Sequence, residues 1–232
     1  MIEKRRRLVV ALCVLFVAVG CGVTAMARDR QPPPASTEQV TGRQQALTVL
    51  RRLAVKARAS KAGYARTQFL DGWEDLGDCD IRNFILARDM VQVHVKSAAD
   101  CSVMSGTLHD PYTGKTITFI RGPTTSGKVQ IDHVVALSDA WQTGAQDLTA
   151  AQRYQLSNDP LELLAVDGQA NEDKSDGDAE AWLPPNKDFR CRYVARQVAV
   201  KQKYHLWVTA GEDQAIATVL SDCPGQPLPV VQ

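Results

Sequence analysis

The chain has 232 residues, of which 23% are charged, and its formal net charge is +1. This length suits one well-buried domain with appendages. Residues 1–27 carry four basic residues and one acidic residue, so the rest of the chain has a net charge of about −2. That balance excludes a protein that grips nucleic acid mainly through bulk positive charge, and any polyanion site must be local.

Residues 1–27 have the pattern of an export segment. A basic stretch, Lys4-Arg5-Arg6-Arg7, precedes the apolar run from Leu8 to Val19. The small residues that follow end in Ala25-Met26-Ala27, which is a plausible signal-peptidase site.

Two other interpretations of this segment remain open. Val19-Gly20-Cys21 resembles the end of a lipobox, which would place a lipid on Cys21. The stretch from Leu8 to Ala27 also has 20 residues without a charge, close to the length of one membrane span, so an uncleaved membrane anchor is an alternative. All three interpretations predict an extracytoplasmic protein, secreted or attached to the cell envelope.

The cysteines support export independently. Two of the six lie in the export segment, which leaves Cys79, Cys101, Cys191 and Cys223. Four cysteines outside the cytoplasm indicate two disulfides, with three possible connectivities. We expect Cys79 to pair with Cys101 and Cys191 with Cys223, because each pair closes a short local loop. None of the four pairs at the two-residue spacing of a zinc knuckle, so structural zinc is not expected.

The first predicted elements follow a linker. Residues 28–44 include Pro32-Pro33-Pro34, which favours an extended tether, and the domain is expected at 45–232. Apolar residues at helical spacing predict a helix in the later part of 36–58. The apolar residues between Asn83 and Val95 predict a strand on either side of Arg88-Asp89.

The pattern sharpens from residue 116 onward. Alternating polar and β-branched residues predict a strand at 116–120, and a second strand is expected at 129–135. Further expected elements are helices in 137–155, 171–182, 193–204 and 212–220, and a strand at 161–166. This mixed order indicates a single domain of α+β class.

Three short segments carry residues suited to phosphodiester hydrolysis. They are Asp132-His133, Asn158-Asp159-Pro160 and Asn171-Glu172-Asp173-Lys174-Ser175-Asp176. The reaction needs a base that deprotonates water and a hard cation that stabilises charge on the phosphate and the leaving oxygen. Carboxylate and amide oxygens suit Mg²⁺ or Mn²⁺, and an imidazole can serve as the base. The segments can supply each part.

The segment Asp132-His133-Val134-Val135-Ala136-Leu137 resembles the opening of the HNH, or ββα-metal, endonuclease motif, and 171–176 resembles its closing helix. The sequence around this motif is similar to secreted HNH endonuclease family proteins of actinobacteria, which are related to the C-terminal domain of GmrSD-type restriction enzymes. This similarity runs from about Ala46 to Cys223. It implies a ββα-metal core at about 116–182.

The resemblance also implies roles for individual residues. Asp132 and Asn171 would hold one divalent cation, Mg²⁺ or Mn²⁺, and His133 would be the general base. The middle Asn of the motif would fall at position 162, where this chain has Glu162. Either Asn158 substitutes for it, or the position tolerates glutamate, or activity is impaired. A neutral histidine is needed, so activity should rise through a pKa of about 6.5.

The implied substrate is nucleic acid, and DNA is expected ahead of RNA because HNH relatives mostly cut DNA. The resemblance does not give the oligomeric state, and a monomer is expected. Candidate phosphate contacts are Lys174, Lys115, Arg121 and Lys128, since a compact cluster of cations can guide a backbone on a protein of negative net charge.

Competing interpretations remain. Asp132 could be a strand-end cap, and Asn171 could cap the helix that follows it. The acidic residues from Glu172 to Glu180 favour a solvated helix face, and Asp78-x-Asp80-x-Arg82 favours a loop tied by a disulfide. The rival functions are a catalytically impaired binding protein with the same fold and a phosphodiesterase for a smaller or lipid phosphate.

Overall fold

The computed structural model describes residues 44–70, 72–97 and 99–230. The predicted export segment and all but the last residue of the predicted linker lie outside these ranges. Within them, no helix has both the length and the apolar character needed to cross a membrane.

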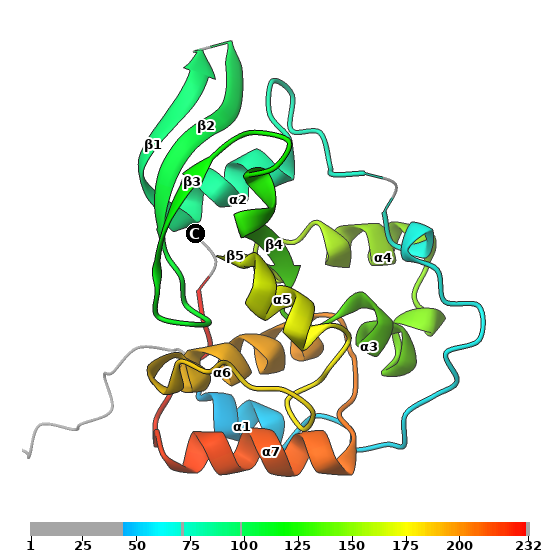
Figure 1. The fold of residues 1–232 in the computed structure, drawn as a ribbon. Coiled ribbons are helices and arrows are strands. Elements are labelled where there is room, and N and C mark those ends of the chain that lie inside the picture. Colours follow the sequence, from blue (N-terminus) through cyan, green and yellow to red (C-terminus); the bar gives the residue numbers. More distant parts are fainter. Residues whose placement is uncertain (1–43, 71, 98, 231–232) are drawn as a thin grey trace, which may run out of the picture. The chain divides into compact units, whose positions relative to one another are not determined.

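Helices and strands are mixed along the described chain (Figure 1). In chain order the elements are α1 (Ala46–Leu50), η1 (Arg66–Gln68), α2 (Ile81–Asp89), β1 (Met90–Ser97), β2 (Asp100–His109), β3 (Thr116–Ile120), η2 (Ser126–Lys128), β4 (Val129–His133), α3 (Leu137–Gln142), η3 (Ala145–Asp147), α4 (Ala150–Ser157), β5 (Leu163–Asp167), α5 (Gly168–Lys174), α6 (Lys187–Lys203) and α7 (Ala210–Ser221). The predicted α+β class is confirmed.

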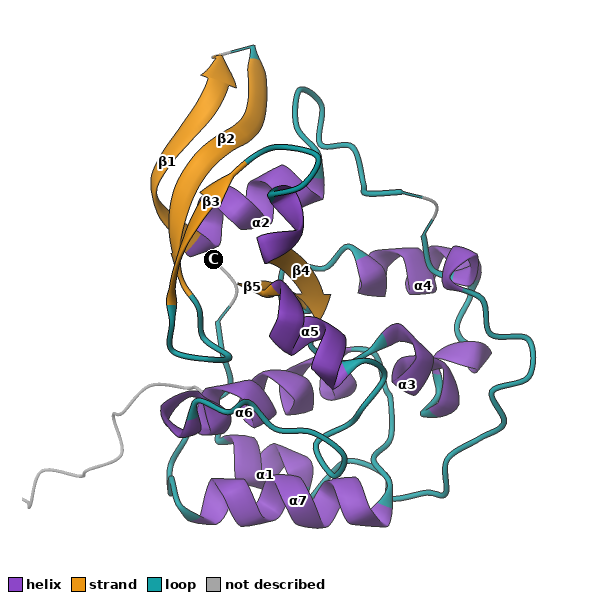
Figure 2. Ribbon diagram, viewed as in Figure 1, coloured by secondary structure: helices purple, strands orange, loops and turns teal. Residues whose placement is uncertain are grey.

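The strands form two separate antiparallel sheets (Figure 2). One sheet has the order β1-β2-β3 and lies against α2. The other contains only β4 and β5, in a register that places Asp132 opposite Leu164 and His133 opposite Leu163. Helix α5 follows β5 directly, so two antiparallel strands and one helix form a compact unit that carries Asp132, His133 and Asn171.

Two hydrophobic cores hold the elements in place. The larger core joins α1, α3, α6 and α7 to part of β5 and to the residues that follow β4. The smaller core fills the space between α2, the three-stranded sheet and the inner residues of β4 and β5. Because β4 and β5 lie between the two cores, most of their side chains are buried, and the end of β4 is held on both sides.

Both predicted disulfides are confirmed. Cys79 pairs with Cys101 at a Cα–Cα distance of 5.6 Å, which ties the segment before α2 to β2. Cys191 pairs with Cys223 at 6.4 Å, which ties α6 to the residues after α7.

The strand predicted before Arg88-Asp89 is wrong, because residues 81–89 form helix α2. The Asp80 side chain accepts a hydrogen bond from the Asn83 amide at 2.7 Å and caps the helix. Ile81, Ile85 and Leu86 then share its buried face. A short apolar run is compatible with a helix or a strand, and here the cap decides between them.

The predicted helix at 171–182 is shorter and begins earlier, at Gly168–Lys174. Its N-cap is Asp167, whose side chain accepts from the Ala170 amide at 2.9 Å. It ends where Ser175 has a φ of 52°, in the left-handed region.

Candidate active site

Asp132, His133 and Asn171 line one cavity with a volume of about 570 Å³. The first two lie at the end of β4, and Asn171 lies within α5. Asp132 and His133 are each 5% exposed, so only a small part of each side chain faces the cavity.

His133 is held in one orientation by a backbone carbonyl. Its Nε2 lies 2.9 Å from the Ser157 carbonyl oxygen, and because a carbonyl can only accept, the ring proton is on Nε2. The Trp73 indole lies nearly parallel to the imidazole, with 5° between the planes and 6.1 Å between the centroids. These contacts leave Nδ1 as the nitrogen with a free lone pair.

The histidine is neutral over a wide pH range. Burial lowers the pKa of His133 to about 3, and the positive charge of Arg66 acts in the same direction. The expected rise of activity through a pKa of about 6.5 therefore needs correction, since the imidazole is already neutral well below that pH.

Asp132 has partners on both carboxylate oxygens. Oδ1 accepts from the Lys174 ammonium at 2.9 Å, and Oδ2 accepts from the Tyr112 hydroxyl. Burial raises the pKa of Asp132, and the attraction of Lys174 opposes that shift. A carboxylate oxygen has two acceptor directions, so each of these oxygens retains one lone pair.

Lys174 lies behind Asp132 and is not among the side chains that line the cavity. Its ammonium also donates to the His133 carbonyl oxygen at 2.9 Å, and the residue is 2% exposed. The position suits a residue that orients Asp132 and the end of β4, and it is unsuited to the direct phosphate contact expected from the sequence.

Asn171 is inside α5, so the interpretation of this residue as the helix cap is wrong. Its Nδ2 donates to the Gln130 side-chain oxygen at 2.8 Å. This contact fixes the amide plane and leaves Oδ1, the atom that can bind a cation, for another partner.

The donor set fits a hard divalent cation. Asp132 and Asn171 offer a carboxylate oxygen and an amide oxygen on one cavity, which matches the preference of Mg²⁺ for oxygen ligands with several retained waters.

The two candidates for the middle Asn lie outside this cavity. The Asn158 side chain accepts from the Glu74 amide at 3.1 Å and donates to the Tyr154 carbonyl at 3.0 Å. It follows Ser157, and so it stabilises the turn whose carbonyl holds His133. Glu162 is fully buried, and both its oxygens accept from the Val135 amide at 3.2 Å. Burial raises the pKa of Glu162 well above its usual value, which favours the neutral acid.

The cavity carries cations other than those predicted. Lys115 and Lys128 are exposed at other places, and Arg121 donates to the Val103 carbonyl at 2.7 Å. The lining cations are Lys61, Arg66 and Arg82. Only Arg82 had a signal in the sequence, as the last residue of Asp78-x-Asp80-x-Arg82, and the capping role of Asp80 explains that spacing.

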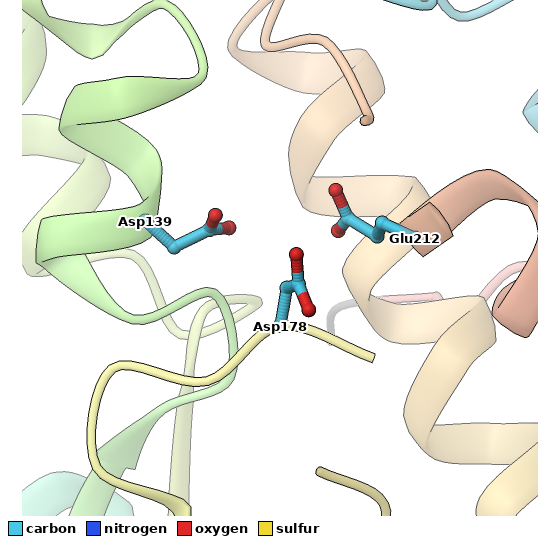
Figure 3. A group of neighbouring side chains, drawn as sticks. All are labelled: Asp139, Asp178 and Glu212. Atoms are coloured by element: carbon cyan, nitrogen blue, oxygen red, sulfur yellow. The ribbon is translucent and has the colours of Figure 1, made fainter. Parts of the chain in front are cut away.

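A second cluster of ionisable residues, drawn in Figure 3, contains none of the residues that line the cavity. Asp139 of α3, Glu212 of α7 and Asp178 of the loop after α5 point toward one another, each with an oxygen within 4.8 Å of the others. Asp178 is buried, so the expectation of a solvated helix face is wrong for this residue. Three buried carboxylates of this geometry could hold a metal ion.

Two basic side chains already form ion pairs with this cluster. Arg58 bonds Asp139 at 2.6 Å and Asp178 at 2.5 Å. The Lys201 ammonium, with a side-chain exposure of 0%, lies 3.2 Å from Asp139 and 2.9 Å from Glu212. Burial also raises the pKa of Glu212 to about 7. The cluster is therefore an ion-pair network that joins α3, α6 and α7.

Comparison with known proteins places the chain in a protein family. The model of "GmrSD restriction endonucleases, C-terminal domain" matches residues 80–219, which include the whole two-strand and helix unit. An "Uncharacterized secreted protein" of Arthroderma benhamiae is 34% identical over 211 residues, 90% of this chain and 98% of that protein. No solved structure matches. The chain belongs to the family defined by the C-terminal domain of the GmrSD restriction endonucleases.

Proposed function

We propose that this protein is a metal-dependent endonuclease of the HNH, or ββα-metal, type that hydrolyses phosphodiester bonds in nucleic acid, with DNA as the expected substrate. The observation that carries the proposal is the placement of Asp132, His133 and Asn171 on one cavity by two antiparallel strands and a helix. The family supports a nuclease in general.

His133 is the general base. Its Nδ1 takes a proton from water while Nε2 stays bonded to Ser157, so the ring keeps its orientation as it becomes charged. The water oxygen bonds to phosphorus as the bond from phosphorus to the 3′ oxygen breaks. The 3′ oxygen leaves as an alkoxide that takes a proton from solvent water. The imidazolium then loses its proton to solvent, because burial disfavours the charged ring.

Asp132 and Asn171 hold the divalent cation. A bound Mg²⁺ or Mn²⁺ supplies positive charge that stabilises the phosphate and the leaving oxygen. Lys174 and Tyr112 orient the Asp132 carboxylate from behind, and Gln130 orients the Asn171 amide. Arg66 and Arg82 line the same cavity and are suited to hold a phosphate.

The proposed location is outside the cytoplasm. The basic and apolar pattern of residues 1–27 and the two disulfides support this, as does a relative that is described as secreted. The proposal includes three forms of the N-terminus: a cleaved signal peptide, a lipid on Cys21 and an uncleaved anchor. Because the three forms differ in mass, the mass of the mature protein distinguishes them.

The test is cleavage of a supercoiled plasmid in EDTA, Mg²⁺ or Mn²⁺. Nicking is expected only with metal, and His133→Ala should lower its rate by about 100-fold or more. His94→Ala is the matched control, because His94 is exposed on β1 outside the cavity and should leave the rate unchanged.

One observation favours an alternative, a binding protein without turnover. Both Asp132 oxygens already have a partner, so a cation would have to share them. No product from either the unaltered or the His133→Ala protein, or equal products that come from a contaminating nuclease, would support this alternative, provided that nucleic acid still binds.

A further inference from the structure

One wall of the cavity comes from a loop that precedes the matched family domain. Lys61, Tyr64, Arg66 and Trp73 all line the cavity, and all lie before residue 80, where the family match begins. Two cations and two aromatic rings therefore line the same cavity as the end of β4 and α5, from a segment whose described residues form only the short helix η1.

The two aromatic rings are partly covered by the core. Trp73 lies parallel to His133, and Tyr64 contacts Trp141 edge-on at 6.3 Å between centroids. Both residues are half-buried, so each presents part of its ring to the cavity. Lys61 lies 5.7 Å from the centre of the Tyr64 ring. Aromatic surface next to cations is the combination that binds unpaired bases and their phosphates.

The arginines provide the complementary phosphate contacts. Arg66 is exposed, and Arg82 donates to the Val129 carbonyl at a long 3.3 Å, the single hydrogen bond of its side chain among the described residues. A guanidinium has five N–H donors, so most of those of Arg82 remain for a ligand. Both side chains line the same cavity as Trp73.

We infer that this cavity takes single-stranded nucleic acid, with an unpaired base stacked on the Trp73 and Tyr64 wall and an adjacent phosphate on Arg66 and Arg82. The inference rests on the proposed nuclease function and names its substrate class. In a continuous duplex the bases are stacked on one another, and extrusion of one base costs a few kcal/mol. A chain with a net charge of about −2 after residue 27 has little bulk attraction for a duplex to offset that cost.

The test is binding in EDTA, which keeps the strand uncut, by fluorescence anisotropy of the full chain with both disulfides formed. Three labelled 12-mers are compared: a single strand, the same strand paired with its complement, and an abasic strand of equal length. The single strand should bind at least about fivefold more tightly than the other two. This comparison needs no mutation.

Single substitutions then test which residues cause the preference for the base-containing single strand. Trp73→Ala should weaken binding of the base-containing strand by about fivefold or more and leave the abasic strand unchanged, whereas Trp73→Phe should retain most of the affinity. Arg66→Ala should weaken both strands. Tyr154→Ala is the control, because Tyr154 is an exposed aromatic residue outside the cavity.

Duplex binding that equals or exceeds single-strand binding would overturn the inference, and so would equal affinity for the abasic and base-containing strands. Absence of cleavage in Mg²⁺ or Mn²⁺, with the strand preference intact, would refute the proposed nuclease activity and leave the binding preference standing.

Discussion

Two regions of this protein each contain a buried lysine that is paired with a buried carboxylate. At the cavity, buried Lys174 contacts Asp132, and in the network of α3, α6 and α7, buried Lys201 contacts Asp139 and Glu212. Each lysine also donates to a backbone carbonyl oxygen. Buried charge therefore does not distinguish a structural region from a chemical one.

The two regions differ in whether other side chains of the protein or open volume lie next to their polar atoms. In the network, Arg58 covers Asp139 and Asp178, so cations of the chain itself occupy the space between the carboxylates. At the cavity, His133 and Asn171 line open volume instead, and His133 Nδ1 and Asn171 Oδ1 have no hydrogen-bond partner among the described residues. A site for a ligand is indicated by polar atoms that internal contacts orient but leave with a free lone pair.

Removal of Lys201 gives the largest expected effect on stability. Lys201→Ala leaves Asp139 and Glu212 buried without their shared cation, so the free energy of unfolding should fall by roughly 3–5 kcal/mol in urea titrations. Lys187→Ala, at an exposed position of the same helix, should change it by less than about 0.5 kcal/mol. If Lys201→Ala unfolded with the same free energy as the unaltered protein, Lys201 would not be the cation that stabilises these two carboxylates.

The pH dependence of stability should separate the two regions. His133 has a pKa of about 3 when folded and about 6.5 when unfolded, so its contribution is present above pH 6.5 and is lost as the pH falls toward 3. Glu212, with a raised folded pKa of about 7, acts oppositely: its contribution is lost as the pH rises from about 4.5 to 7.

The two effects partly cancel in the unaltered protein, and His133→Gln removes only the first. Urea unfolding between pH 4 and pH 7 should show that the unaltered protein loses more stability on acidification than His133→Gln does, by several kcal/mol. Equal pH slopes in the two proteins would mean that His133 is not buried as a neutral ring.

Asn171 should affect the metal requirement. Asn171→Ala is expected to raise the Mg²⁺ concentration for half-maximal cleavage by about tenfold or more, and Asn171→Asp should restore an oxygen ligand. Gln169→Ala, on the exposed side of α5, is the control. An unchanged metal requirement in Asn171→Ala would remove this residue from the metal site.

The smallest expected effect comes from the cations outside the cavity. Lys128→Ala should change single-strand affinity by less than about twofold, while Arg82→Ala should weaken it several-fold and reduce the salt dependence by about one counterion. Both changes remove one positive charge, so a similar loss from each would show that general electrostatics, and not the cavity, controls binding.

The sequence was informative wherever neighbours along the chain decide the outcome. Strong periodicity predicted β3, α6 and α7, and the short loops predicted both disulfides. The sequence pattern gave the wrong prediction for α2, because an apolar run is compatible with a helix or a strand and the Asp80 cap decides between them. The resemblance to a known motif identified Asp132, His133 and Asn171 as candidates, although α3, η3, α4 and β5 lie between β4 and α5 along the chain.

The tertiary structure alone decided the surroundings of those residues. Lys61, Arg66 and Trp73 line the cavity from a loop that is distant in sequence from β4 and α5. A periodic pattern of apolar residues does not predict such a long-range contact. The pairing of Lys174 with Asp132 and the low pKa of His133 likewise depend on burial. Sequence patterns report short-range preferences of the backbone, whereas burial and charge environment arise from the packing of distant segments, and that packing makes His133 a neutral base and sets which cations face the substrate.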